Sequence, residues 1–141
     1  MSYSSSVSIV INAPLKKVWD ALTIPEQVRE YFFGTNMITT WEVGSPIFFQ
    51  GEWEGKTYED KGIVLEYTPM QSFSYNYWSS MGDTEDKPEL YQVLSYSLSE
   101  TSDGIKLMVT QSNVDTQEKA DHSAKNWEGV LGLMKAFVEK K

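Results

Sequence analysis

Aromatic side chains are the most abundant groups in this sequence that could form a binding site. The 141 residues include 5 Trp, 8 Tyr and 6 Phe. Tyr and Trp combine a large apolar body with one hydrogen-bonding group, which suits a pocket that holds a mostly hydrophobic molecule through a few polar contacts. Any one of these residues could instead simply fill the core, because regularly spaced apolar residues are usually buried. The candidate lining residues are Phe49, Trp53, Phe73, Tyr75, Tyr77, Tyr96, Trp127, Leu131 and Met134.

Carboxylates on or near predicted strands form a second set of candidates, for acid/base chemistry. The pKa of a carboxylate held in an apolar cavity is raised toward a value useful for proton transfer. Glu52 and Glu66, however, are out of phase with the apolar residues of their strands, which favours a solvated position. A buried carboxylate beside a tyrosine would support catalysis, and an entirely apolar lining would contradict it. The candidates are Glu42, Glu52, Glu54 and Glu66.

Metal sites are less well supported by the sequence. Glu118 and His122 have the i, i+4 spacing that places two ligands on one side of a helix, but no third ligand is near them in sequence. The acidic residues Asp83, Glu85 and Asp86 lack the spacing and the glycine of a calcium-binding loop. An exposed pair and a solvated loop are the expected structures, and no metal or other cofactor is predicted.

Charge and composition exclude several classes of protein. Twelve Lys and Arg against twenty Asp and Glu give a net charge of −8, which disfavours binding to nucleic acid or to an anionic membrane. The absence of Cys excludes thiolate chemistry and is typical of a reducing compartment. Residues 1–6 do not resemble a signal peptide, and no apolar run approaches the ~18 residues of a membrane span. We expect a soluble, cytoplasmic domain, and the sequence leaves its oligomeric state open.

The first third of the chain predicts one strand and two short helices. Residues 7–11 alternate as a strand does, and the apolar residues of 15–22 recur at helical spacing after Pro14. Pro25 suits the start of a second helix, since proline fits the first helical position, and Gly34 suits its end.

Beyond residue 36 the pattern becomes alternating, with turn residues at regular intervals, which predicts an antiparallel meander. Within one of the strands, Ile63, Leu65 and Tyr67 are expected to share the apolar face. The remaining strands likewise offer one apolar, aromatic face. The predicted strands are 47–53, 56–68, 73–77, 94–98 and 105–109.

Residues 116–140 return to helical spacing and predict one long final helix. Asp115, with Glu118 three residues later, is the expected N-terminal cap. The order of elements is that of an α+β fold, and the simplest packing lays this helix on the aromatic face of a curled sheet. The buried stripe is expected to comprise Ala120, Ala124, Trp127, Leu131, Met134 and Val138, widened by Val130 and Phe137.

The order and spacing of short segments along nearly the whole chain resemble the single-domain homologues of the activator of the heat-shock protein 90 ATPase, within the START-like, or helix-grip (SRPBCC), superfamily. This resemblance implies a curved antiparallel sheet that grips the C-terminal helix, with a hydrophobic cavity between them. The segments are Ile11-Asn12-Ala13-Pro14, Val18-Trp19-Asp20-Ala21-Leu22-Thr23, Pro25-Glu26-Gln27, Trp41-Glu42-Val43-Gly44, Gly62-Ile63-Val64-Leu65-Glu66 with Pro69, and Trp127, Leu131, Met134 and Lys135.

The chain departs from the family pattern at three places. Ser45 and Asn126 stand where the family often has glycine, and Tyr31-Phe32-Phe33 stands where a tryptophan is common. We expect these differences to alter the shape of the cavity or its entrance.

The function that this sequence predicts is the non-enzymatic binding of a small hydrophobic molecule by a single START-like domain over residues 1–141. Two alternatives stay open. The resemblance implies a co-chaperone-like module that stimulates a chaperone ATPase, to which an acidic surface would contribute. It also implies an enzyme like the polyketide cyclases and dehydratases of the superfamily, although no nucleophile and base pair is visible in the sequence.

Overall fold

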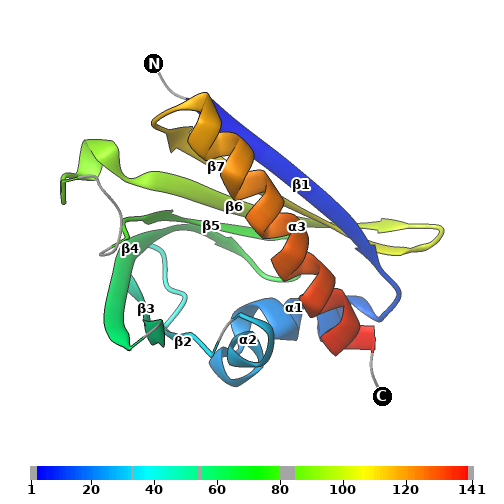
Figure 1. The fold of residues 1–141 in the computed structure, drawn as a ribbon. Helices are drawn as coiled ribbons and strands as arrows, with labels where there is room; N and C mark the ends of the chain where they lie inside the picture. Colours follow the sequence, from blue (N-terminus) through cyan, green and yellow to red (C-terminus); the bar gives the residue numbers. More distant parts are fainter. Residues whose placement is uncertain (1–2, 33, 54, 80–84, 140–141) are drawn as a thin grey trace.

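The computed structural model describes residues 3–32, 34–53, 55–79 and 85–139. Within them, one strand and two short helices precede a series of strands, and a long helix ends the chain (Figure 1). This is the predicted α+β order. The elements are β1 (Tyr3–Ile11), α1 (Leu15–Thr23), α2 (Pro25–Tyr31), β2 (Asn36–Thr39), β3 (Pro46–Trp53), β4 (Lys56–Thr68), β5 (Ser72–Tyr77), the 3₁₀ helix η1 (Pro88–Leu90), β6 (Gln92–Thr101), β7 (Gly104–Val114) and α3 (Gln117–Glu139).

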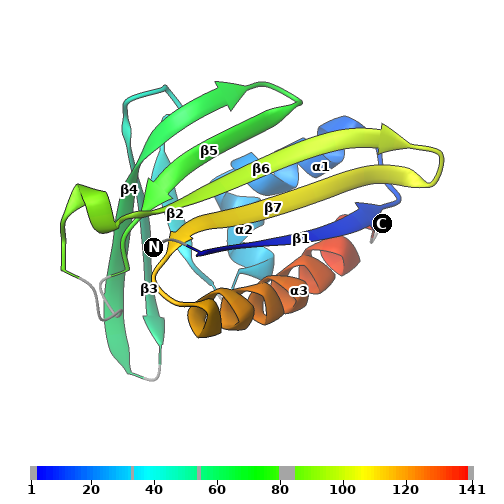
Figure 2. The same ribbon diagram turned by 90° about the horizontal axis from the view of Figure 1, so that it is seen from above.

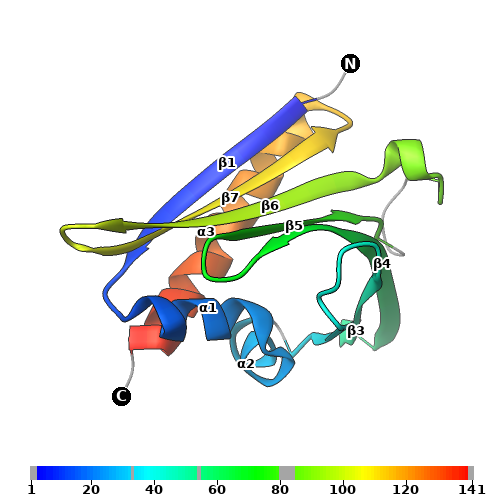
Figure 3. The same cartoon turned by 180° about the vertical axis from the view of Figure 1, so that it is seen from behind.

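The strands form one antiparallel sheet in the order β1-β7-β6-β5-β4-β3-β2. Figure 2 shows that β3 and the first part of β4 run across the direction of β1, β6 and β7, so the sheet is strongly curved. The helix α3 lies on the concave face, and in the view from the other side it is behind the sheet (Figure 3). The structure therefore confirms the predicted curved sheet with a long helix against one face.

The curvature is concentrated in β4. Gly62 is buried, and a Cβ atom at this position would lie 1.7 Å from the backbone oxygen of Asn76, so only glycine allows β4 and β5 to approach each other here. Two residues later the pairing with β5 shifts between Val64 and Glu66, which marks a β-bulge. A bulge bends its strand, so β4 can pair with β3 in one part of the sheet and with β5 in the part that runs in the other direction.

The same bulge corrects the predicted face of β4. Ile63 and Leu65 were expected to be buried with Tyr67, but they are 44% and 39% exposed, whereas Val64 is fully buried. The extra residue at the bulge changes which positions point inward, because alternation restarts after it. Val64 and Tyr67 both face the core, and Ile63 and Leu65 point outward.

The two short helices close one end of the molecule, next to the C-terminal end of α3 (Figure 1). Pro25 begins α2, as predicted, and the extended backbone of Ile24 separates it from α1. Gly34 follows α2 with a φ of 73°, a left-handed conformation that favours glycine. Tyr31 fixes the two helices together, because its hydroxyl donates a hydrogen bond to the backbone oxygen of Ala21 at 2.8 Å.

The helix α3 begins one residue after its predicted start, and its cap is Thr116 rather than Asp115. The backbone N–H of Lys119 donates a hydrogen bond to Thr116 Oγ1 at 3.1 Å, which is the geometry of an N-cap. Asp115 forms an ion pair with the Lys119 side chain instead. The buried stripe is Ala120, Trp127, Val130, Leu131, Met134 and Val138.

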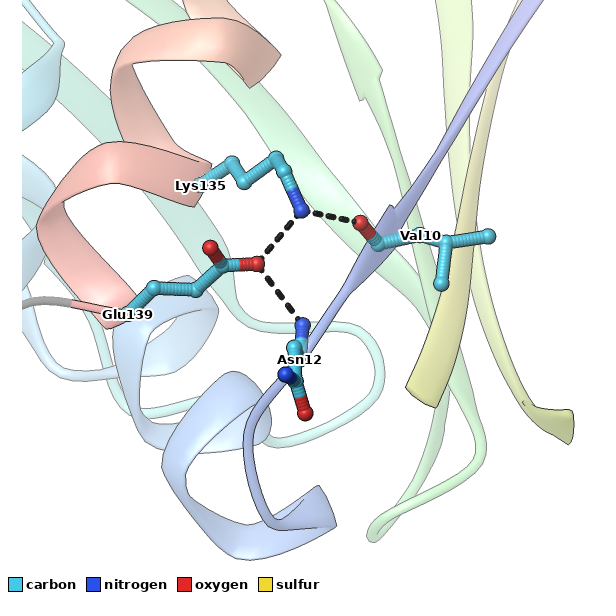
Figure 4. Close-up of polar contacts among 4 residues, drawn as sticks. All are labelled: Val10, Asn12, Lys135 and Glu139. Carbon is cyan, nitrogen blue, oxygen red and sulfur yellow. Dashed lines mark hydrogen bonds and ion pairs between the residues drawn. The ribbon is translucent and has the colours of Figure 1, made fainter. Parts of the chain in front are cut away.

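The C-terminal end of α3 is fastened to the end of β1 (Figure 4). Lys135 Nζ donates to the backbone oxygen of Val10 at 2.7 Å and also pairs with the carboxylate of Glu139. The backbone N–H of Asn12 donates to Glu139 Oε2 at 2.8 Å. The hydrogen bond from the Lys135 ammonium, and to a smaller extent the one from the Asn12 N–H, holds the pKa of Glu139 below its ordinary value. None of the helices in the described part of the chain has the length and apolar composition that a membrane crossing requires.

Candidate binding cavity between the sheet and the final helix

A cavity of about 380 Å³ lies between the concave face of the sheet and the N-terminal half of α3. Its walls come from five strands, from α3 and from the segment between α2 and β2. Asn126, which is exposed, lies where the cavity meets solvent. Half of the described lining residues are aromatic. The lining consists of Phe32, Thr35, Phe49, Tyr58, Asp60, Tyr75, Tyr77, Leu94, Gln111, Ser123, Asn126 and Trp127.

The bend in β4 explains why a space remains at this end. The first part of β4 and its partner β3 run across the direction of the other strands (Figure 2). Inward-facing side chains of these strands, such as Phe49 and Tyr58, line the same cavity as the N-terminal half of α3. The helix contributes only one large apolar side chain to the lining, Trp127, together with the small polar Ser123 and Asn126.

The structure divides the nine predicted lining residues into three groups. Phe49, Tyr75, Tyr77 and Trp127 line the cavity. A second group lies deeper, around a void of about 20 Å³, which is the size of a single water molecule. This deeper group comprises Phe73, Tyr96, Leu131 and Met134. The backbone of Trp53 belongs to β3, but its side chain lies outside the described residues.

Trp127 is the residue of α3 that lines both the cavity and the deeper void, and it shares this position with Phe32, Phe49 and Tyr75 from other elements. It is 8% exposed, and its ring meets those of Phe32 and Tyr96 edge to face at 5.9 and 5.8 Å. Its indole N–H donates to Gln111 Oε1 at 3.0 Å, and Gln111 in turn donates to Gln92. The polar tip of the indole is therefore satisfied inside the protein, and its ring is held in one orientation.

Asp60 is a cavity residue that the sequence reasoning missed. It lies on β4, is only 7% exposed, and accepts a hydrogen bond from the Tyr77 hydroxyl at 2.6 Å. Burial raises the pKa of Tyr77 well above its ordinary value, and Asp60 raises it further. The tyrosine therefore stays protonated and acts as the donor. This is the buried carboxylate beside a tyrosine that would support catalysis.

The three described carboxylates among the four considered from the sequence do not take this position. Glu42, Glu52 and Glu66 are exposed, and Glu54 lies outside the described residues. Asp60 has the same parity as Val64 on β4, ahead of the bulge, but the sequence pattern placed that parity on the outer face and so gave no usable signal for Asp60. The charged neighbours Glu59 and Lys61 also made a solvated position the expected one.

Two hydrogen-bonded pairs of hydroxyl groups also lie at the cavity. Thr35 Oγ1 and the Tyr58 hydroxyl lie 2.6 Å apart and are hydrogen bonded, and Tyr75 is bonded through its hydroxyl to Tyr96 at 2.9 Å. Burial raises the pKa of Tyr75 and of Tyr96 above the ordinary tyrosine value. The hydroxyls of Tyr75 and Tyr96 therefore stay protonated and neutral.

Two of the departures from the family pattern fall at this cavity. Asn126 and Phe32 both line it, whereas Ser45 does not, and Phe33 lies outside the described residues. Tyr31 is buried and lines the deeper void instead.

The described residues considered as metal ligands are all exposed. Glu118 and His122 are both exposed on α3, and the described residues contain no group of three or more acidic, His or Cys side chains placed to hold an ion. Asp86 instead forms an ion pair with Lys61 at 2.6 Å. Glu85 is exposed, and Asp83 lies outside the described residues.

Comparison with known proteins places the chain in a family. The family model described as Activator of Hsp90 ATPase homolog 1-like protein matches residues 12–139. A protein from Cytophaga hutchinsonii, with a known solution structure, is 39% identical over 97% of this chain and 94% of its own, with a TM-score of 0.84.

More distant structures share the fold. CalU16 from Micromonospora echinospora is 20% identical, with 98% and 77% of the two chains covered and a TM-score of 0.76. The Aha1 dimer from Colwellia psychrerythraea is 18% identical, with 97% and 96% covered and a TM-score of 0.74. No curated protein matches the chain. With the START-like helix-grip fold and a family match over residues 12–139, the chain belongs to the Activator of Hsp90 ATPase homolog 1-like family.

Proposed function

We propose that this protein binds a small molecule with a largely apolar body in the cavity between the sheet and α3. The observation that carries the proposal is the cavity itself, whose volume of about 380 Å³ is within the range of small-molecule sites. Its aromatic walls supply apolar contact, and Gln111, Thr35 and Tyr58 supply polar groups that can orient a ligand. The absence of Cys supports a cytoplasmic location for this activity.

A neutral fluorescent probe tests the proposal directly. N-phenyl-1-naphthylamine, which is uncharged at neutral pH, should bind at one site per chain with an increase in fluorescence. Ser123→Phe places a ring in the cavity from α3 and should remove this binding. Glu128→Phe adds the same ring at an exposed position of the same helix that does not line the cavity, and should leave binding intact.

Trp127→Ala is the complementary variant, since it removes the largest aromatic wall contributed by α3. It should abolish probe binding while circular dichroism stays native. If the wild-type protein binds neither this probe nor any member of a broad hydrophobic panel, including fatty acids, the proposal is wrong.

The pair formed by Asp60 and Tyr77 supports a second candidate, acid/base catalysis of the polyketide cyclase or dehydratase type. The Asp60 carboxylate can accept a proton from the carbon next to a carbonyl group, and the Tyr77 hydroxyl, when its one proton turns from Asp60 to the carbonyl oxygen, can donate to that oxygen. The test is exchange of the acidic C–H protons of an aromatic 1,3-diketone into deuterium oxide, followed by NMR. Exchange above background that disappears in Asp60→Asn supports catalysis, and an unchanged rate in that variant contradicts it.

Interaction with a chaperone is a further proposal, supported by the family description. Addition of the protein should raise the ATPase rate of a heat-shock protein 90, and the two should sediment as a complex. No change in rate together with no complex would remove this candidate.

A further inference from the structure

We propose that the cavity selects organic cations, that is, ligands in which an ammonium group is attached to an aromatic or aliphatic body. This inference rests on the proposed binding function and specifies the class of ligand. It follows from three observations. The described lining has a single carboxylate, it is rich in aromatic rings, and the lysine next to that carboxylate in sequence lies outside the cavity.

The charge of the lining is negative. Among the described residues that line the cavity, Asp60 is the one carboxylate, and none is Lys, Arg or His. Asp60 is 7% exposed, so solvent screens it poorly and its attraction for a cation in the cavity is stronger than at the surface. The same carboxylate repels an anionic ligand.

Lys61, the neighbour of Asp60 in sequence, belongs to the opposite face of β4. Its ammonium group pairs with Asp86 at 2.6 Å and lies 5.5 Å from the centre of the Trp78 ring. Hydrogen bonding to Asp86 raises the pKa of Lys61, so it stays charged in this outward position. Lys61 is therefore not one of the groups that line the cavity with Asp60.

Aromatic rings surround the same space. Phe49 lies 5.4 Å from Tyr75 and 6.0 Å from Tyr77 between ring centres, and Trp127 and Phe32 meet edge to face across from them. The faces of such rings are electron-rich and attract cations, most strongly where water is excluded. Several aromatic rings combined with a carboxylate form the kind of enclosure that binds quaternary ammonium groups.

The whole molecule favours the same ligand class. A net charge of −8 on 141 residues produces a negative potential around the protein, which increases the local concentration of cations and decreases that of anions. The net charge of the protein speeds the approach of a cation to the cavity, and salt weakens this attraction. The attraction between a bound cation and the buried Asp60 is screened much less.

Three naphthyl probes of different charge test the inference, and the first two are isosteres. They are (2-naphthylmethyl)trimethylammonium, its uncharged isostere 2-neopentylnaphthalene, and the anion 2-naphthylacetate. Each is titrated against N-phenyl-1-naphthylamine bound to the wild-type protein, and its affinity is obtained from displacement. The cation should bind at least about tenfold more tightly than the isostere, and the anion should bind most weakly.

Two isosteric variants locate the origin of this preference. Asp60→Asn keeps an oxygen that can accept from Tyr77 but removes the charge, and it should weaken the cation about tenfold while leaving the isostere unchanged. Glu59→Gln removes the same charge from the adjacent exposed residue, whose carboxylate is bonded to Gln50 at 2.6 Å, and it should change neither affinity.

The outcomes separate the two proposals. If the cation binds no more tightly than the isostere, or if Asp60→Asn weakens both equally, the preference for cations is wrong while hydrophobic binding stands. If the fluorescent probe and all three naphthyl compounds fail to bind, the proposed function fails and this inference fails with it.

Discussion

The two halves of the interface between the sheet and α3 are built differently. At the C-terminal half of the helix, Leu131, Met134 and Val138 are at most 1% exposed and leave a void of only about 20 Å³. At the N-terminal half, Ser123 and Asn126 face a cavity of about 380 Å³. One helix therefore contributes to a filled core and to an open site, with Trp127 between them.

The difference originates in what faces the helix. The closed half of α3 ends beside α1 and α2 (Figure 1), whereas the open half faces the cavity whose other walls include β3 and β4. The helix stripe itself is apolar on both sides of Trp127, because Ala120 is as buried as Val138. Periodicity on α3 thus identifies the buried face but does not distinguish a filled compartment from an empty one.

The strongest test of this comparison is truncation of one residue in each half. Leu131→Ala removes a fully packed side chain in the closed half and should lower the free energy of unfolding by about 2–5 kcal/mol. Asn126→Ala, at the cavity opening, should change it by no more than about 0.5 kcal/mol, in the stabilising direction because Ala favours helix. Urea unfolding followed by circular dichroism measures both. Similar losses of unfolding free energy in the two variants would contradict the division of the interface into a packed half and an open half.

The second prediction concerns the bend that keeps one half open. In Gly62→Ala the new Cβ would meet the backbone oxygen of Asn76 at 1.7 Å, so β4 and β5 must move apart, at a cost of about 1–3 kcal/mol or more. Affinity for N-phenyl-1-naphthylamine should fall with it, because the bend shapes the cavity.

Gly132→Ala is the matched control for this variant. Its Cβ would have no neighbour within 4 Å, and replacing glycine within α3 should stabilise the protein by about 1 kcal/mol without changing probe affinity. Normal stability and normal probe binding in Gly62→Ala would show that the close approach of β4 and β5 is not required.

The smallest predicted effect is the pH dependence of the fastening at the closed half. The pKa of Glu139 is lower in the folded protein than its ordinary value of 4.5, so its carboxylate stabilises the fold above that pH, and the contribution is lost as the pH falls through the folded value. Urea midpoints of the wild type and Glu139→Gln should differ at pH 7 and converge in acid. A constant difference across this range would mean that the ion pair and the Asn12 contact contribute nothing through charge.

Sequence periodicity predicted most of this fold, because strands and helices with long regular patterns carry their own signal. The strand 56–68 is observed with the same bounds, and the final helix lies within one residue of its expected limits at each end. The four-residue β2 was not predicted, since so short a segment shows no clear alternation. Thr116 and Asp115 are both good capping residues, and only the backbone conformation selects between them.

The candidate site could be predicted less completely, because it depends on contacts between distant parts of the chain. Tyr75, Tyr77 and Trp127 were expected from their spacing alone. Asp60 was missed because its neighbours are charged and its partner Tyr77 is 17 residues away, on another strand. Ile63 and Leu65 were placed on the wrong face because no residue type in that segment signals a bulge.

The bend in β4 also bears on how such a protein can diverge. The part of the sheet formed by β2 and β3 joins the rest through β4, so the width of the cavity depends on the curvature of one strand. Substitutions near one glycine and one bulge can then enlarge or narrow the site, while the packed half of the helix continues to supply stability. The fold thereby separates most residues that determine the size of the cavity from the residues of the packed half of α3, and Gly62 is an exception because it affects both cavity shape and stability.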